Sequence, residues 1–125
     1  MKEFKRLTVW EKAHQLALAI YSVTATFPKE EIYGLRSQMR RCAASVPANI
    51  AEGCGRTGNG DFHRFLNIAA GSAFELEYFL LLSRDLSFIS SQLHEVLAED
   101  THRVQRMLAS LLRKVETSRR AAANT

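Results

Sequence analysis

Two Glu-x-x-His motifs, at residues 11–14 and 99–102, are the pattern most suggestive of chemistry in this sequence. Together with Glu52 and Glu75 they match the ligand set of a carboxylate-bridged di-iron helical bundle, which requires every ligand to point inward. Helical-wheel positions argue against such a site, because Glu11 lies roughly 160° from the centre of its apolar stripe and Glu99 and His102 lie roughly 130° and 170° from theirs. We therefore predict no metal site.

The segment Gly53–Gly58 has the spelling G-x-G-x-x-G of a dinucleotide-binding loop. That motif binds pyrophosphate only where it follows a strand and opens a helix, whereas here it follows a predicted helix. We interpret its glycines as a helix C-cap and a flexible hinge, and predict no nucleotide or other cofactor.

The cysteines, Cys42 and Cys54, lie twelve residues apart with no histidine pair at zinc spacing, so packing roles are expected. Cys54, in the glycine-rich loop, could be reactive, but nothing beside it is placed to activate it. Two cysteines, and a start without an apolar core of signal-peptide length, favour a reducing compartment, the cytoplasm. No catalytic residues are predicted, and we expect a protein that is not an enzyme.

Basic residues are the better functional candidates. The 125-residue chain has a net charge of +4, divided into +4 for residues 1–50, −5 for residues 51–100 and +5 for residues 101–125. Guanidinium groups on rigid helices suit phosphate contacts, so we predict a nucleic-acid-binding surface made of Lys5, Arg6, Arg36, Arg40, Arg41, Arg113, Lys114, Arg119 and Arg120. Intramolecular charge pairing, and compensation of a helix dipole at residues 113–120, are the alternatives. No aromatic platform for base-specific recognition is evident.

Hydrophobic periodicity predicts one domain, residues 1–125, with helices over about 9–26, 33–53, 61–86 and 92–118 and a frayed C-terminal tail. Expected N-caps are Thr8, Asn59 or Gly60, and Ser90 or Ser91, and Pro47 should kink the second helix. Each helix has an apolar stripe, and those stripes include Tyr21 in the first helix and Val96 in the fourth. Short loops between such helices indicate an all-α, antiparallel up-down four-helix bundle. The sequence has no uninterrupted run of about 18 apolar residues, which is the length needed to span a membrane, so no membrane partner is predicted.

The predicted helix over 61–86 has two apolar faces. Its main stripe is Phe62, Phe65, Leu66, Ala69, Ala73, Leu76, Leu80 and Ser83. A second face carries Ala70, Phe74, Tyr78 and Leu81. A single bundle covers one face of a helix, so the second face indicates self-association, with Phe74, Tyr78 and Leu81 at the interface. Packing of long aromatic side chains on the helix edge is the alternative.

Three segments carry a family resemblance: residues 33–53 (YGLRSQMRRCAASVPANIAEG), residues 4–13 (FKRLTVWEKA) and residues 62–77 (FHRFLNIAAGSAFELE). Over residues 4 to about 115 the chain resembles the 23S rRNA intervening-sequence proteins. The resemblance implies a small bacterial cytoplasmic four-helix bundle that forms a homopentameric ring and has no established enzymatic activity. Related retroelement accessory proteins assist a reverse transcriptase and carry a positively charged ring, which implies nucleic-acid contact.

Four residues in the matched segments, Arg40, Asn49, Glu52 and Glu75, lie close enough in register to form a structural polar network, with Arg41 as a further member. Partner binding is the alternative role. The sequence thus predicts a homo-oligomeric bundle that binds RNA or DNA without strong sequence preference. An oligomeric scaffold for a protein partner is the alternative.

Overall fold

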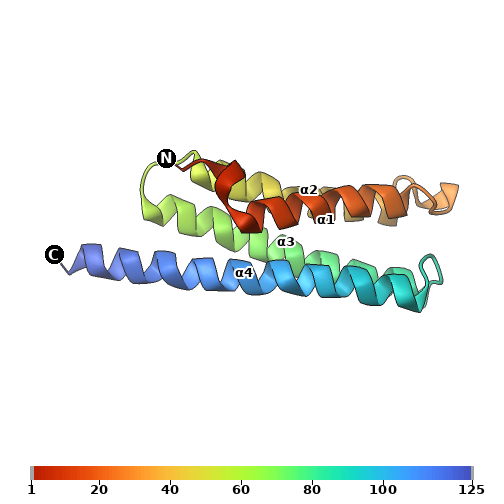
Figure 1. Ribbon diagram of the computed structural model, residues 1–125. Helices are drawn as coiled ribbons and strands as arrows, with labels where there is room; N and C mark the ends of the chain where they lie inside the picture. The colour runs from red at the N-terminus through yellow and green to blue at the C-terminus, as the bar shows by residue number, and fades with distance from the viewer. Residues whose placement is uncertain (1, 125) are drawn as a thin grey trace.

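Four long helices make up almost the whole protein. The computed structural model describes residues 2–124, and within that range it has α1 (Thr8–Thr24), α2 (Leu35–Cys54), α3 (Asn59–Asp85) and α4 (Ser91–Ala123), with no strand. Two short 3-10 helices, η1 (Phe4–Arg6) and η2 (Lys29–Glu31), precede α1 and α2. The all-α fold class and the four-helix bundle are confirmed (Figure 1).

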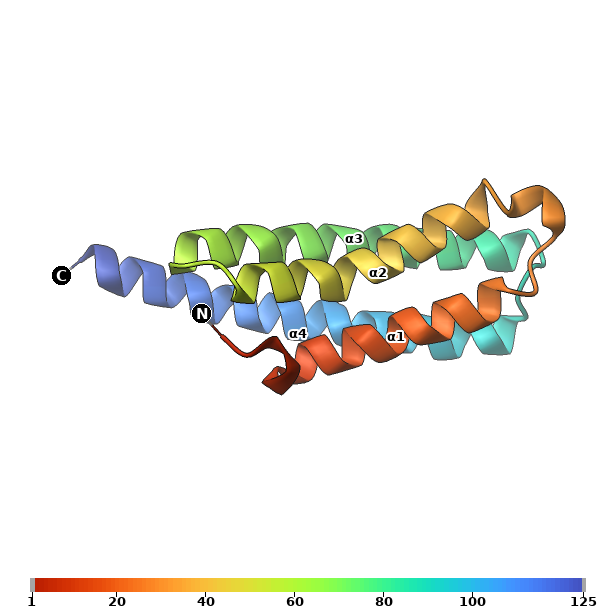
Figure 2. The same ribbon diagram turned by 90° about the horizontal axis from the view of Figure 1, so that it is seen from above.

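The helices form a four-cornered bundle in which each packs against two others. α1 packs against α2 and α4, and α3 also packs against α2 and α4, so α1 and α3 lie on diagonal corners (Figures 1 and 2). α3 has 27 residues and is therefore about 40 Å long. The two ends of the bundle are correspondingly far apart.

The C-terminal tail was predicted wrongly. Residues after Ser118 were expected to fray, but α4 continues to Ala123 and its end projects beyond the other helices (Figures 1 and 2). The segment is rich in alanine and arginine, which have high helix propensity. Local propensity therefore extends α4 where no core contact is available.

Helix caps were predicted with mixed success. The Ser90 side chain accepts a hydrogen bond from the Leu93 N–H at 3.1 Å, as expected of an N-cap. Thr8, however, is already the first residue of α1, and its N-cap, Leu7, makes no side-chain capping bond. Gly58, with φ of 86°, is the N-cap of α3 in place of Asn59 or Gly60.

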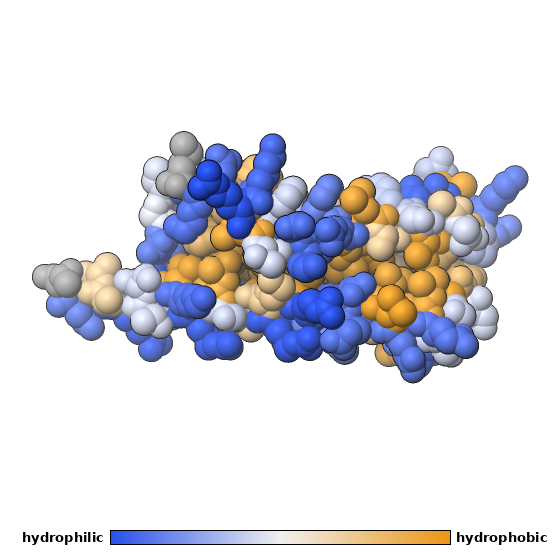
Figure 3. All heavy atoms as spheres, viewed as in Figure 1, coloured by the Kyte–Doolittle hydropathy of each residue, from blue (hydrophilic) through white to orange (hydrophobic). Residues whose placement is uncertain are grey.

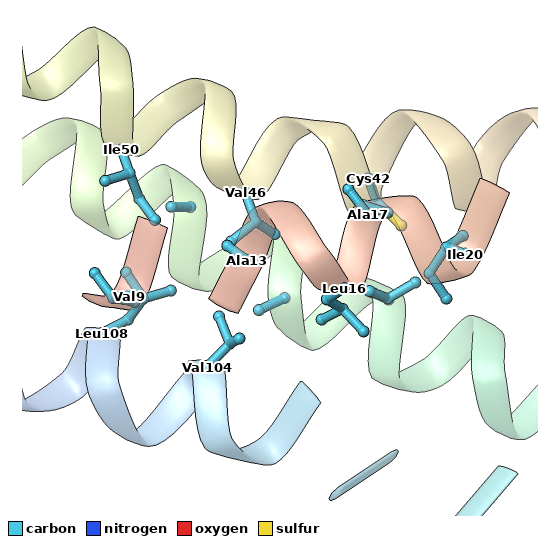
Figure 4. Close-up of a cluster of buried hydrophobic side chains, with 14 of the residues drawn as sticks. Val9, Ala13, Leu16, Ala17, Ile20, Cys42, Val46, Ile50, Val104 and Leu108 are labelled. Carbon is cyan, nitrogen blue, oxygen red and sulfur yellow. The ribbon is translucent and has the colours of Figure 1, made fainter. Parts of the chain in front are cut away.

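The core is a continuous layer of aliphatic side chains between the four helices. Figure 4 shows residues of α1, α2 and α4 meeting there, among them Ile20, Val46 and Leu108. Every one of the eight residues predicted for the main stripe of α3 is buried. Removal of this apolar surface from water is the main term that stabilises the bundle.

Two stripe residues were placed wrongly. Tyr21 and Val96 are 45% and 59% exposed, whereas Leu16 and Thr101, which were not predicted to belong to the stripes, are buried. The buried hydroxyl of Thr101 donates to the Leu97 carbonyl at 2.7 Å, and this hydrogen bond offsets the free energy lost when the hydroxyl is removed from water. Pro47 lies inside α2 and is buried, and the axis of α2 changes direction along its middle (Figure 2).

α3 is the one helix within residues 2–124 that is long and apolar enough on average to cross a membrane, by length and composition alone. It contains polar residues and no uninterrupted run of about 18 apolar ones, but its mean hydropathy over an 18-residue window is 1.3. Only 28% of that window is buried inside the bundle. The high hydropathy of α3 thus reflects two apolar faces, one inside the bundle and one outside it.

Candidate functional site

The predicted basic residues fall into two clusters at opposite ends of the bundle. The first, the α2 cluster, is Arg36, Arg40 and Arg41, in the first two turns of α2. The second, the terminal cluster, lies toward the end that carries both chain termini (Figure 1) and consists of Lys5, Arg6, Arg113, Lys114, Arg119 and Arg120. The structure therefore does not form one basic surface from these residues within a single subunit.

Arg40 connects α2 to α1. Its Nε–H donates to Thr24 Oγ1 and its Nη2 donates to the Tyr21 carbonyl, both at 2.9 Å. The guanidinium also lies 4.7 Å from the centroid of the Tyr21 ring. Thr24 is fully buried and in turn donates to the Ile20 carbonyl at 2.7 Å. These contacts give Arg40 a structural role at the α1–α2 contact.

Arg36 and Arg41 are different, because neither forms an ion pair within residues 2–124. Both line a surface hollow of about 440 Å³, here called the Tyr33 hollow. Its lining residues are Tyr21, Ile32, Tyr33, Arg36, Ser37, Arg40 and Arg41. The hollow thus combines aromatic rings with guanidinium groups and has no carboxylate among its lining residues.

Part of the terminal cluster is neutralised. Arg119 and Arg120 both pair with Glu116, at 3.0 and 3.5 Å. Arg113 and Lys114 have no ion-pair partner within residues 2–124 and line a hollow of about 470 Å³ with Ser110, Thr117 and Ser118. Glu116 offsets one of the two charges with which it pairs, so the free positive charge of the terminal cluster is carried mainly by Arg113, Lys114, Lys5 and Arg6.

The predicted polar network does not form. Arg40 bonds to α1, as described, while the Asn49 amide donates to the Ser45 carbonyl and hydroxyl at 2.8 and 2.9 Å. Glu52 pairs with Arg56 at 2.6 Å, and Glu75 is exposed. Each of the three polar side chains on α2 thus bonds to a partner outside the predicted network. A bond between Ser45 Oγ and Ser72 Oγ, 2.8 Å long, joins α2 to α3 instead.

Histidine–glutamate pairs join α3 to α4. His102 Nε2 lies 3.1 Å from Glu77 Oε2, and the Gln105 amide donates to Glu77 Oε1 at 2.8 Å. Hydrogen bonds from Gln105 and His102 hold the pKa of Glu77 below its ordinary value, against a smaller opposing effect of burial. A second pair, His63 and Glu116, lies 3.5 Å apart. Sequence reasoning missed both pairs, since each joins residues that are distant in the chain.

The Glu-x-x-His residues are dispersed. Glu11 is exposed and accepts a long bond from Gln15 at 3.5 Å, and the His14 ring stacks on Trp10. Glu99 pairs with Arg106 on the same helix. Within residues 2–124 no group of three or more His, Cys, Asp or Glu side chains is arranged to hold a metal ion.

The glycine-rich segment also differs from expectation. Gly53 and Cys54 belong to the end of α2, not to a loop, and both are buried. A Cβ on Gly53 would lie 3.0 Å from Phe62 Cδ1 and from Phe65 Cβ, so this glycine allows α2 and α3 to approach closely. Burial raises the pKa of the Cys54 thiol, and burial followed by the charge of Glu75 raises the pKa of Cys42 to about 12. Neither thiol is therefore activated.

The second apolar face of α3 is solvent-exposed in the single chain. Phe74, Tyr78 and Leu81 are 61%, 57% and 38% exposed. Figure 3 shows further hydrophobic side chains gathered in separate areas of one face of the bundle, with hydrophilic ones between them. The self-association that this face indicates stays a prediction for the single chain described.

A groove of about 470 Å³ between α1 and α2 was not foreseen. Its lining is almost entirely apolar and consists of Phe4, Trp10, His14, Ala17, Leu18, Tyr21, Ala44, Pro47 and Ala48. The small residues Ala44 and Ala48 of α2 leave the space that the larger side chains of η1 and α1 surround. We refer to it as the α1–α2 groove.

Comparison with known proteins assigns the chain to a family. The family model for the 23S rRNA-intervening sequence protein matches residues 5–110. The chain belongs to this family. The resemblance stated from the sequence is thereby confirmed, and the family match includes the α2 cluster, the Tyr33 hollow and every lining residue of the α1–α2 groove except Phe4.

A solved structure supports the same assignment. A protein of unknown function from the S23 ribosomal protein family of Bacteroides thetaiotaomicron is similar, with a TM-score of 0.79 and 27% sequence identity. The match covers 84% of this chain and 95% of that one. Among curated proteins, none matches the chain. Arg113, Lys114, Arg119 and Arg120 of the terminal cluster lie outside the part matched by the family model for the 23S rRNA-intervening sequence protein.

Proposed function

We propose that this 23S rRNA-intervening sequence protein is a non-enzymatic cytoplasmic bundle that assembles with copies of itself and binds RNA or DNA without strong sequence preference. The observation that carries the proposal is the distribution of unpaired positive charge. Arg56, Arg64, Arg84, Arg103, Arg106, Arg119 and Arg120 all have carboxylate partners. Arg36, Arg41, Arg113 and Lys114 have none within residues 2–124, so their charge is available to phosphates.

The assembly follows from two apolar surfaces on different sides of the bundle. Phe74, Tyr78 and Leu81 project from α3, whereas the α1–α2 groove borders α1, on the diagonal corner. When one surface of a subunit binds a different surface of the next copy, the contact is head-to-tail. Repeating such a contact produces a closed ring if the rotation between neighbouring subunits divides a full turn evenly. The family resemblance implies five subunits.

Sedimentation tests the assembly. We expect the wild-type protein to sediment as a multiple of its 14.1 kDa monomer, and Phe74→Glu to shift it toward the monomer because the charge cannot be buried at the contact. Ile68→Glu is the matched control, since Ile68 is 42% exposed on the same helix but lies about 120° around it from Phe74. A wild-type protein that sediments as a 14.1 kDa monomer at high concentration would refute self-association.

The salt dependence of binding tests the nucleic-acid proposal. The logarithm of the binding constant should fall linearly with the logarithm of salt concentration, by about 0.7 for each phosphate neutralised on a single strand and about 0.9 on a duplex. A flat response, or no binding at low salt, contradicts the proposal. Arg103→Ala should leave binding unchanged, because Arg103 is already paired with Asp100.

A scaffold that binds a protein partner is the second candidate, favoured by the apolar lining of the α1–α2 groove. It predicts no nucleic-acid binding at low salt, and it places the protein partner in the groove in place of the α3 face of the next copy. It also predicts a co-purifying protein that is lost in Leu18→Glu, since Leu18 is 57% exposed in the groove. The salt titration and the pull-down together separate the two candidates.

A further inference from the structure

We propose that the Tyr33 hollow is a binding site for single-stranded RNA or DNA, with an unpaired base stacked on Tyr33 and backbone phosphates bound by Arg36 and Arg41. This inference rests on the proposed nucleic-acid binding and names the strand type and the residues that select it.

The first supporting feature is the exposure of Tyr33. Its side chain is 96% exposed, although tyrosine usually buries much of its ring. The backbone beside it is held in place, because Glu31 Oε1 accepts the Leu35 N–H at 3.0 Å where α2 begins. The ring therefore projects from a fixed position and both of its faces are accessible to a ligand.

The second feature is the charge around the ring. The hollow is lined by three arginines, and none of its lining residues is acidic. The nearby Glu31 carboxylate is engaged by the backbone of α2, and Arg36 and Arg41 have no ion-pair partner within residues 2–124. Guanidinium groups without a carboxylate partner retain their donors for phosphate oxygens.

The third feature is the fixed position of Arg40. Its Nε and Nη2 donate to Thr24 and to the Tyr21 carbonyl, and its Cζ lies 4.7 Å from the centroid of the Tyr21 ring. Arg40 is therefore a positioning residue, which holds α2 against α1 at the hollow. Its positive charge still adds to the potential in the hollow.

The combination favours single strands over duplexes. The faces of a base in a duplex are covered by its neighbours, so an aromatic ring can stack only on a base that is unpaired and exposed. The volume of about 440 Å³ lies within the range of about 300–1,000 Å³ typical of small-ligand sites. Stacking on one ring tolerates any base, which agrees with binding without strong sequence preference.

Fluorescence anisotropy with a labelled 15-nucleotide oligouridylate and a labelled 15-base-pair duplex tests the inference at low salt. We expect the wild-type protein to bind the single strand more tightly, and Tyr33→Ala to weaken that binding about tenfold, as loss of one base–aromatic stack does. Tyr33→Phe should bind as the wild type, because it keeps the ring. The double variant Arg36→Ala/Arg41→Ala should lower the salt slope by about 0.7 for each phosphate contact removed.

The controls separate this inference from the proposed function. Arg103→Ala should behave as the wild type, because Arg103 is paired with Asp100 and lies on α4, which does not pack against α2. If the wild-type protein binds the single strand and Tyr33→Ala binds it equally well, or if the duplex binds as tightly, the Tyr33 site is refuted while nucleic-acid binding stands. If the wild-type protein binds neither probe, the proposed function fails and the inference fails with it.

Discussion

Arg40→Ala should destabilise the bundle, because the Arg40 side chain forms hydrogen bonds from α2 to α1. The substitution removes a partly buried, charge-assisted hydrogen bond to Thr24, an exposed one to the Tyr21 carbonyl, and the contact with the Tyr21 ring. A hydrogen bond to a charged group contributes about 1.5 kcal/mol or more, and the exposed contacts add less. We expect a loss of about 2 kcal/mol in the free energy of unfolding, equivalent to a decrease of about 8 °C in Tm for a chain of this size.

Thermal and urea unfolding followed by circular dichroism measure this loss. Arg41→Ala is the matched control: Arg41 is the next residue, is exposed and has no ion-pair partner within residues 2–124, so its removal should change stability by less than about 0.5 kcal/mol. Measurement at several protein concentrations separates unfolding from dissociation of an oligomer.

A double-mutant cycle isolates the bond between Arg40 and Thr24. Thr24→Val removes the acceptor at similar volume, and the cycle cancels the accompanying loss of the bond from Thr24 to the Ile20 carbonyl. We expect a coupling free energy of about 1 kcal/mol between the two side chains. A coupling near zero, or equal stability of Arg40→Ala and Arg41→Ala, would refute the structural role of Arg40. Weaker RNA binding by Arg40→Ala at unchanged stability would instead place Arg40 in contact with the nucleic acid.

Four further predictions concern the core residue Leu76, the contact between α3 and α4 at Glu77, the buried thiol of Cys42 and the turn at Ser87. Leu76→Ala, at a fully buried site, should cost about 3 kcal/mol in urea unfolding; a cost below about 1 kcal/mol would contradict the packing described. The stabilisation from Glu77 should be complete above its unfolded pKa of 4.5 and lost as pH falls through its lower folded pKa, so Glu77→Gln should flatten the pH dependence of unfolding there; identical slopes would argue against the Gln105 and His102 bonds. Because burial raises the pKa of Cys42 to about 12, this thiol should react with a disulfide reagent only after denaturation; rapid reaction of the folded protein would contradict its burial. Ser87 has a φ of 63°, so Ser87→Gly should stabilise the protein by about 0.5 kcal/mol, and destabilisation would show that its side chain has another role.

The success of the sequence analysis was greatest where structure depends on local periodicity. The α3 stripe was predicted at all eight positions and Ser90 was identified as a possible cap, because spacing along one helix determines both. Tyr21 and Val96 were misplaced for a related reason. A residue at the edge of an apolar stripe is buried only if a neighbouring helix covers it, and the spacing of apolar residues in one helix does not show where its neighbours lie.

The candidate binding surfaces were harder to predict because each is made by several elements. The α1–α2 groove needs Phe4 from η1, Leu18 from α1 and Pro47 from α2, and the Tyr33 hollow needs Tyr21 from α1 beside Arg36 of α2. The basic residues themselves were identified in the sequence. What the sequence did not reveal was which of them are neutralised, since pairing depends on side-chain direction.

The size of the exposed apolar face explains why a closed ring would suit this chain better than a dimer. Phe74, Tyr78 and Leu81 are each partly covered already, and fully burying one such side chain contributes at most about 1.5–3 kcal/mol. Association costs an estimated 4 kcal/mol or more in translational and rotational freedom, so one contact between two copies yields little net free energy. In a ring, the last contact forms between subunits that are already connected, and its effective concentration makes it far more favourable than the first. If, as we propose, the α3 face of one copy meets the α1–α2 groove of the next, a closed ring would therefore be more stable than an open pair.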